Sequence, residues 1–239
     1  MPIAIIQQYF GLGDCIFSQG VASHFIDQGY RIVWPVWDDF CEGLSRAYPD
    51  MTWLPHSFFK PELFDIKEEK ILGEVRLLPI SWSNQILNAS TWMHTKYDLY
   101  GLDYHDWKKH ASYQRDPLRE QALMAHYGIR IGEPYNLANS MFRTNASGNT
   151  PFTIANDYKT VQMQILPEFS LFDYSLLIEN ATEIHVANSS ILYLLELLDL
   201  RAEQVHLYCR VPDETDFRHV DYLFSKPYVL HYPTQQMVA

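Results

Sequence analysis

Residues 11–14 read Gly-Leu-Gly-Asp and follow an apolar N-terminal run directly. Glycine lets the chain turn sharply and lets a ligand approach the backbone, because it has no Cβ. A carboxylate at the carboxyl end of a strand lies where doubly wound sheets bind ligands, and it can accept a proton from a hydroxyl. Gly11, Gly13 and Asp14 are therefore candidate substrate-binding residues, with Asp14 as general base. In the alternative interpretation Asp14 only caps the helix that follows.

This turn does not fit the common nucleotide-binding motifs. The dinucleotide fingerprint needs a third glycine where this chain has Ile16, and Asp38 is the nearest acid after the second predicted strand. The Walker pattern of glycines followed by Lys and Ser or Thr is absent. A nicotinamide-dependent oxidoreductase and a phosphate-loop nucleotidase are both disfavoured.

A second polar turn, Asn188-Ser189-Ser190, separates the predicted strand 183–187 from an apolar helix. Two hydroxyls and the free backbone N–H groups at the start of a helix can hold a diphosphate. Glu196 lies two helical turns beyond Ser189 on the same face and can accept hydrogen bonds from ribose hydroxyls. The alternatives left open are ordinary helix capping by the turn and a solvent-facing Glu196.

A leaving diphosphate needs positive charge, and we consider three cations. Arg143 and Arg210 each end a predicted strand of the second half, and Lys96 lies in a helical segment between the halves. The ten histidines show no helical ligand spacing and the three cysteines form no CxxC pair, so the sequence predicts no metal site.

Composition and charge exclude several classes of protein. The net charge of −11 argues against nucleic-acid binding, which needs clustered Lys and Arg. No apolar run approaches the length of a transmembrane helix, and the N-terminus lacks the basic start of a signal peptide. With three cysteines and no disulfide pattern, we expect a cytoplasmic protein.

Both halves of the chain alternate strand and helix patterns, which predicts an α/β fold with parallel sheets. The predicted strands are residues 3–10, 30–36, 51–55, 74–80, 135–143, 160–166, 183–187, 204–210 and 227–232. The predicted helices are residues 15–29, 37–50, 170–181, 189–200 and 213–224.

Residues 84–127 are polar, aromatic and mostly helical, and we interpret them as a link between the two halves. We therefore predict two Rossmann-like lobes facing a cleft. The first lobe, with the helical segment, spans residues 1–127, and the second spans residues 128–239.

Toward both ends, over about half of its length, the chain resembles heptosyltransferase-like glycosyltransferases of the GT-B fold, and three stretches carry this resemblance. They are residues 11–36, GLGDCIFSQGVASHFIDQGYRIVWPV, residues 47–55, AYPDMTWLP, and residues 183–200, EIHVANSSILYLLELLDL. The family's donor turn usually carries an acid and a glycine, whereas this chain has Asn-Ser-Ser. The chain is also much shorter than a typical two-lobe member, so we expect a reduced form.

The resemblance implies a metal-independent sugar transfer with no cofactor. The donor is a nucleotide sugar, held through its phosphates at the turn 188–190 of the second lobe. The acceptor is a hydroxyl of a glycan or a lipid-linked saccharide in the first lobe, and Asp14 takes its proton. The alternative, favoured by the altered donor turn and the short chain, is a non-catalytic nucleotide- or carbohydrate-binding protein on the same fold.

Overall fold

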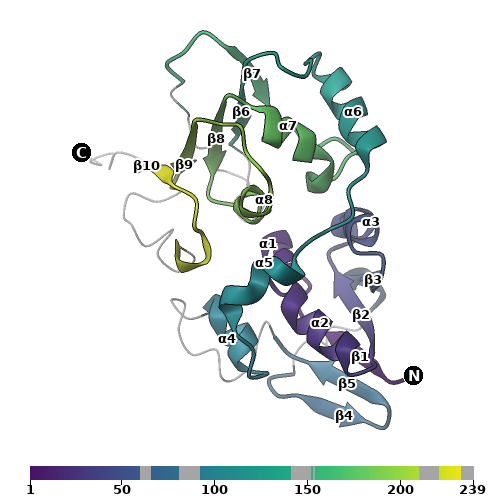
Figure 1. Cartoon of the computed structure of the whole chain (residues 1–239). Helices are drawn as coiled ribbons and strands as arrows, with labels where there is room; N and C mark the ends of the chain where they lie inside the picture. The colour runs from purple at the N-terminus through teal and green to yellow at the C-terminus, as the bar shows by residue number, and fades with distance from the viewer. Residues whose placement is uncertain (60–65, 81–91, 141–151, 153, 210–220, 233–239) are drawn as a thin grey trace, which may run out of the picture. The chain divides into compact units, whose positions relative to one another are not determined.

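The computed structural model describes residues 1–59, 66–80, 92–140, 152, 154–209 and 221–232 (Figure 1). The chain divides into two compact units, Met1–Gln114 and Arg115–Ala239. Each unit is built around a five-stranded sheet. The prediction of an α/β fold with two Rossmann-like sheets is confirmed.

The sheet of the first unit has the strand order β3-β2-β1-β5-β4. Its strands are β1 (Ile3–Ile6), β2 (Arg31–Val36), β3 (Thr52–Pro55), β4 (Lys70–Leu72) and β5 (Val75–Leu78). All neighbouring pairs are parallel except β4 and β5. The sequence did not predict β4, because it is a three-residue edge strand whose residues are all exposed and show no alternation.

Helices of the first unit follow β1 and β2 and then resume after residue 91. They are α1 (Leu12–Phe17), α2 (Gln19–Asp27), α3 (Asp38–Ala47), α4 (Trp92–Asp98) and α5 (Trp107–His110), with 3-10 turns η1 (His56–Phe58) and η4 (Tyr104–Asp106). The predicted helix 15–29 starts earlier, divides at Ser18, and ends before Gly29, whose φ of 85° suits glycine. Asp38 and Asp39 lie in the first turn of α3, at the positive end of its dipole.

The second unit has an entirely parallel sheet in the order β10-β9-β8-β6-β7. Its strands are β6 (Tyr135–Asn139), β7 (Lys159–Gln162), β8 (Glu183–Ala187), β9 (Gln204–Tyr208) and β10 (Tyr228–His231). Its helices are α6 (Pro117–His126), α7 (Ser175–Asn180) and α8 (Ile191–Leu197), with 3-10 turns η5 (Leu171–Tyr174) and η6 (Asp221–Leu223). Ser170 forms the predicted N-cap, here in a capping box with Asp173 before η5.

The unit boundary lies at 114/115, earlier than the predicted 127/128, because α6 packs with the second unit. Arg115 Nη1 contacts Glu179 Oε1 of α7 at 2.7 Å, and its guanidinium also binds Glu120 of α6. Arg119 Nε lies 3.2 Å from Asp173 Oδ1. Glu120 and Asp173 are both buried, so these ion pairs compensate charges removed from water.

No helix among the described residues combines the length and the apolar character that crossing a bilayer requires. The longest, α3 and α6, have 10 residues each. A membrane span needs about 20.

Candidate active site

The turn between β1 and α1 places Asp14 at the carboxyl end of the first strand. Gly11 precedes the helix with a φ of 75°, which L residues rarely adopt. A Cβ on Gly11 would also lie 2.2 Å from Asp14 Oδ2. Gly13, the second predicted glycine, is buried in α1. Only glycine at position 11 therefore lets the Asp14 carboxylate fold back over the turn.

The N-cap residue of α1 is Gly11, and Asp14 lies in the first turn of the helix, so Asp14 does not occupy the capping position. The side chain instead contacts Lys96 of α4, whose Nζ lies 2.5 Å from Asp14 Oδ1 and 2.5 Å from Gln8 Oε1. Lys96 is 0% exposed, whereas the Asp14 side chain is 22% exposed. The structure thus joins two predicted site residues that are 82 positions apart in the sequence.

The partners of Lys96 are fixed by the first sheet and its helices. The carbonyl oxygen of Gln8 accepts a 2.9 Å hydrogen bond from the Trp34 indole, and its side-chain Nε2 donates to the Phe10 carbonyl. Helix α4 is held by Tyr97, whose hydroxyl donates to the Phe17 carbonyl at 2.6 Å and accepts from the Gly20 N–H at 3.2 Å. The ammonium group of Lys96 consequently has a defined position beside Asp14.

The second oxygen of Asp14 is the chemically interesting atom. Oδ2 accepts no hydrogen bond from the described residues, and the side chain reaches solvent. A hydroxyl placed there can give up its proton to this oxygen. The neighbouring Cys15 is an unsuitable nucleophile, because burial, with a smaller contribution from Asp14, raises the pKa of its thiol well above the usual value.

The predicted donor turn follows β8, as expected. Asn188 is buried and its N–H donates to the Tyr208 carbonyl at 3.2 Å. Ser189 Oγ is buried without a hydrogen-bond partner among the described residues, and the Ser190 side chain makes no capping bond to α8. The two serines are therefore not ordinary caps.

The Glu196 side chain does not face solvent and its carboxylate is already hydrogen-bonded. It is buried against the segment that leads into β10. Its carboxylate accepts hydrogen bonds from the Ser225 N–H and hydroxyl, the Lys226 N–H and the Tyr228 hydroxyl, at 2.9–3.1 Å. These donors fill the four acceptor positions of a carboxylate. Ribose binding by Glu196 stays a prediction, and it would have to displace one of these donors.

The predicted cations have different outcomes. Arg143 and Arg210 lie outside the described residues. Lys96 is fully enclosed, so in this structure it serves the Asp14 carboxylate and presents no surface to a phosphate.

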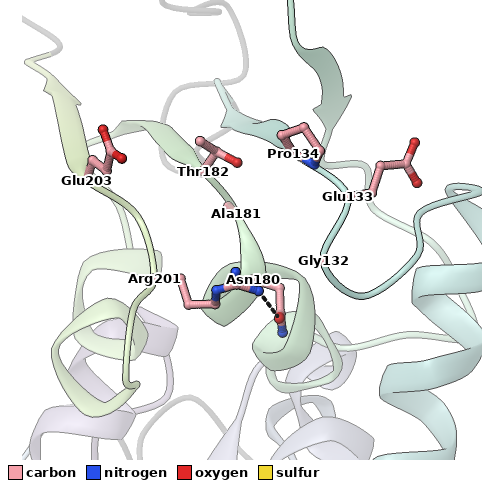
Figure 2. Close-up of a pocket in the computed structure, with 8 residues that line it drawn as sticks. All are labelled: Gly132, Glu133, Pro134, Asn180, Ala181, Thr182, Arg201 and Glu203. Carbon is pink, nitrogen blue, oxygen red and sulfur yellow. Dashed lines mark hydrogen bonds between the residues drawn. The ribbon is translucent and has the colours of Figure 1, made fainter.

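A small polar cavity of about 200 Å³ lies elsewhere on the second unit (Figure 2). Its lining is Gly132, Glu133, Pro134, Asn180, Ala181, Thr182, Arg201 and Glu203. Pro134, Thr182 and Glu203 immediately precede β6, β8 and β9, so the cavity lies at the amino ends of the strands. Parallel α/β sheets bind ligands at the opposite, carboxyl ends. We therefore do not assign this cavity to the donor.

Sequence reasoning missed a polar row on one face of the second sheet. Glu183 and His185 of β8 lie beside His206 of β9. Burial is the main cause that lowers the pKa of both histidines. Alternation along β8, together with histidines in two consecutive predicted strands, is the signal that could have revealed the row.

The chain has an α/β fold of the GT-B type, in which two Rossmann-like units follow one another along the chain. No protein-family model matches the chain, and no curated protein matches its sequence. Solved structures do match, at sequence identities that establish the fold alone.

Three of these structures are sugar transferases. The E. coli ADP-heptose lipopolysaccharide heptosyltransferase II has a TM-score of 0.53 and 12% identity, covering 97% of this chain and 90% of that one. A family 9 glycosyl transferase from Veillonella parvula has a TM-score of 0.59 and 7% identity, covering 96% and 86%. The dodecameric iron-containing heptosyltransferase TibC in complex with ADP-D-β-D-heptose has a TM-score of 0.50 and 14% identity, covering 87% and 58%.

Proposed function

We propose that the chain is a glycosyltransferase that moves a sugar from a nucleotide sugar to a hydroxyl of a glycan or glycolipid. The observation that carries this proposal is the Asp14 carboxylate, held by buried Lys96 through one oxygen and open at the other. Its place after β1, in a fold shared with sugar transferases, supports the same conclusion. The three thiols carry no disulfide, which suits a reducing cytoplasm.

In the proposed reaction the oxygen of the acceptor hydroxyl attacks the anomeric carbon of the donor. Asp14 Oδ2 accepts the proton of that hydroxyl at the same time. A new carbon–oxygen bond forms there, while the bond from that carbon to the diphosphate breaks. The nucleoside diphosphate leaves with the electron pair of that bond. Lys96 is a positioning residue in this scheme, because it touches Asp14 and is closed to substrate.

We place the donor diphosphate at Asn188, Ser189 and Ser190. The unpartnered Ser189 hydroxyl supports this, because a buried polar atom normally has a partner. Arg143 and Arg210 remain the proposed cations for the leaving group, in a reaction that needs no metal at the phosphates. Two similar structures are described with ADP-heptose, so ADP-sugars are the first donors to test.

The experiment measures nucleoside diphosphate release from ADP-, UDP- and GDP-sugars with glycan and glycolipid fractions as acceptors. Asp14→Asn should reduce release by about 10²–10⁴-fold, the usual range for general base catalysis. The control, Asp39→Asn, changes an exposed acid in the first turn of α3 and should leave the rate unchanged.

Equal rates in Asp14→Asn and wild type would remove Asp14 from the mechanism. Tight diphosphate binding without transfer to any acceptor would instead identify the non-catalytic binding protein.

A further inference from the structure

Glu183, His185 and His206 project from one face of the second sheet. His185 pairs with His206 in the parallel register of β8 and β9, and Glu183 lies two residues before His185 on the same face. His231 of β10 pairs in register with Tyr208, the residue two positions after His206, and so shares this face. Alternate residues Ile184 and Val186 are fully buried on the opposite face.

The side chains of the row bring three metal-ligating groups together. One ligand atom from each of Glu183, His185 and His206 lies within 4.8 Å of the other two. His185 Nε2 is 3.3 Å from Glu183 Oε2. Ligand atoms on a tetrahedral zinc ion, with bonds of about 2.0–2.1 Å, lie about 3.3 Å apart. This pair therefore already has the separation that a zinc ion requires.

Each histidine has a contact through Nδ1 that orients its ring. His185 Nδ1 contacts the Tyr208 hydroxyl at 3.2 Å, and His206 Nδ1 contacts His231 Nε2 at 2.8 Å. The described residues supply no hydrogen-bond partner for His206 Nε2. Metal-binding histidines characteristically use one nitrogen as ligand and fix the ring through the other. Tyr208 and His231 can perform that second function here.

We propose that Glu183, His185 and His206 bind one divalent first-row transition metal ion, of which Zn²⁺ fits the ligands best. Two imidazoles and one carboxylate suit zinc, whereas Mg²⁺ and Ca²⁺ prefer oxygen ligands throughout. His185 and His206 bind through Nε2, and a water molecule completes the coordination. The site explains why imidazoles and a carboxylate converge on a sheet face.

Metal binding requires one local change. The rings of His185 and His206 stack at 4.5 Å with 5° between their planes, and the lone pairs of parallel rings do not converge on one ion. The His206 ring must tilt so that its ligand atom approaches those of Glu183 and His185 to the tetrahedral separation of about 3.3 Å. His206 is partly exposed, so it has room to move.

The test uses the full chain, purified without a histidine tag and freed of metal by chelation. Titration calorimetry with Zn²⁺ should give one ion per chain. Co²⁺ should give visible absorption bands of a low-symmetry site, and excess Zn²⁺ should abolish them. Glu183→Gln and His206→Asn change partly exposed side chains and should each weaken Zn²⁺ binding at least tenfold while circular dichroism stays unchanged.

The control variant carries His110→Ala and His126→Ala, which remove two exposed histidines outside the row and should keep wild-type affinity. The proposal would be overturned if wild type showed no saturable Zn²⁺ binding. It would equally be overturned if folded Glu183→Gln and His206→Asn bound the ion as tightly as wild type.

Discussion

The fully buried Lys96 is the most informative residue of the candidate site in the first unit. Its ammonium group is removed from water completely, and this is costly unless charge and hydrogen bonds replace the lost hydration. Asp14 supplies the opposite charge and Gln8 supplies an amide oxygen. A lysine at that position, with no contact to solvent, is best explained by what it does to Asp14.

Lys96→Met tests this role. The variant keeps the length of the side chain but removes the contacts of the ammonium group with Asp14 and Gln8, so the free energy of unfolding should fall by about 1–3 kcal/mol. In transfer assays kcat should fall while KM for the nucleotide sugar stays within twofold, because the carboxylate loses its position and the donor does not. Urea unfolding and steady-state kinetics measure the two effects.

Lys70→Met on exposed β4 is the matched control and should change the unfolding free energy by less than about 0.5 kcal/mol. An unchanged kcat in folded Lys96→Met would show that the lysine has a structural role only.

Substitution of Glu196 tests whether its carboxylate has a structural role or binds ribose. Glu196→Gln cannot accept all four hydrogen bonds, so unfolding should become easier by about 1–3 kcal/mol. The affinity for a nucleoside diphosphate relative to pyrophosphate should not change. Exposed Glu203→Gln serves as the control. A selective loss of nucleoside diphosphate affinity in Glu196→Gln would support ribose binding instead.

Among the elements, α4 matters most to the site, because it carries Lys96 and is joined to α1 and α2 through Tyr97. The Tyr97 hydroxyl bonds to the backbone of Phe17 and Gly20. A Cβ at position 20 would lie 2.5 Å from that hydroxyl, so the close approach of the helices depends on glycine. The position of Lys96 therefore depends on the contacts of Tyr97 with Phe17 and Gly20, which lie more than 70 residues earlier in the sequence.

Gly20→Ala should push Tyr97 away and lower the free energy of unfolding by about 1–3 kcal/mol, despite alanine's higher helix propensity. Transfer activity should fall as well, because α4 carries Lys96. Ser45→Ala on the exposed face of α3 is the control, and denaturant unfolding is the measurement. A more stable Gly20→Ala variant would contradict the packing described for α4.

The sequence predicts elements better than it predicts their partners. Strand β8 has the predicted bounds, because Glu183–Ala187 is a β-rich run between turn residues. The contact of Lys96 with Asp14 is not predictable, because no local pattern links α4 to the turn after β1. Helical spacing does not reveal the polar row, because His185 and His206 lie at paired positions on neighbouring parallel strands.

The whole molecule repeats one plan twice, with a five-stranded sheet in each unit and a polar turn after a central strand of each. The structural similarity to the E. coli and Veillonella parvula transferases extends over nearly the full chain, at 12% and 7% sequence identity. Such similarity fixes the architecture and leaves the chemistry to individual residues. In our account the first unit provides the base and the second provides the diphosphate site.

Nucleotide binding is the most direct test of that account, because it needs no knowledge of the acceptor. The measurement is the thermal midpoint of the full chain with ADP, UDP, GDP, CDP and NAD. One diphosphate should raise the midpoint, and at 100 times its Kd the stabilisation should be about 2.7 kcal/mol. The variant with Ser189→Ala and Ser190→Ala should lose most of this shift, while NAD should give none. A shift with NAD alone, or with none of the diphosphates, would contradict the proposal that the chain uses a nucleotide sugar.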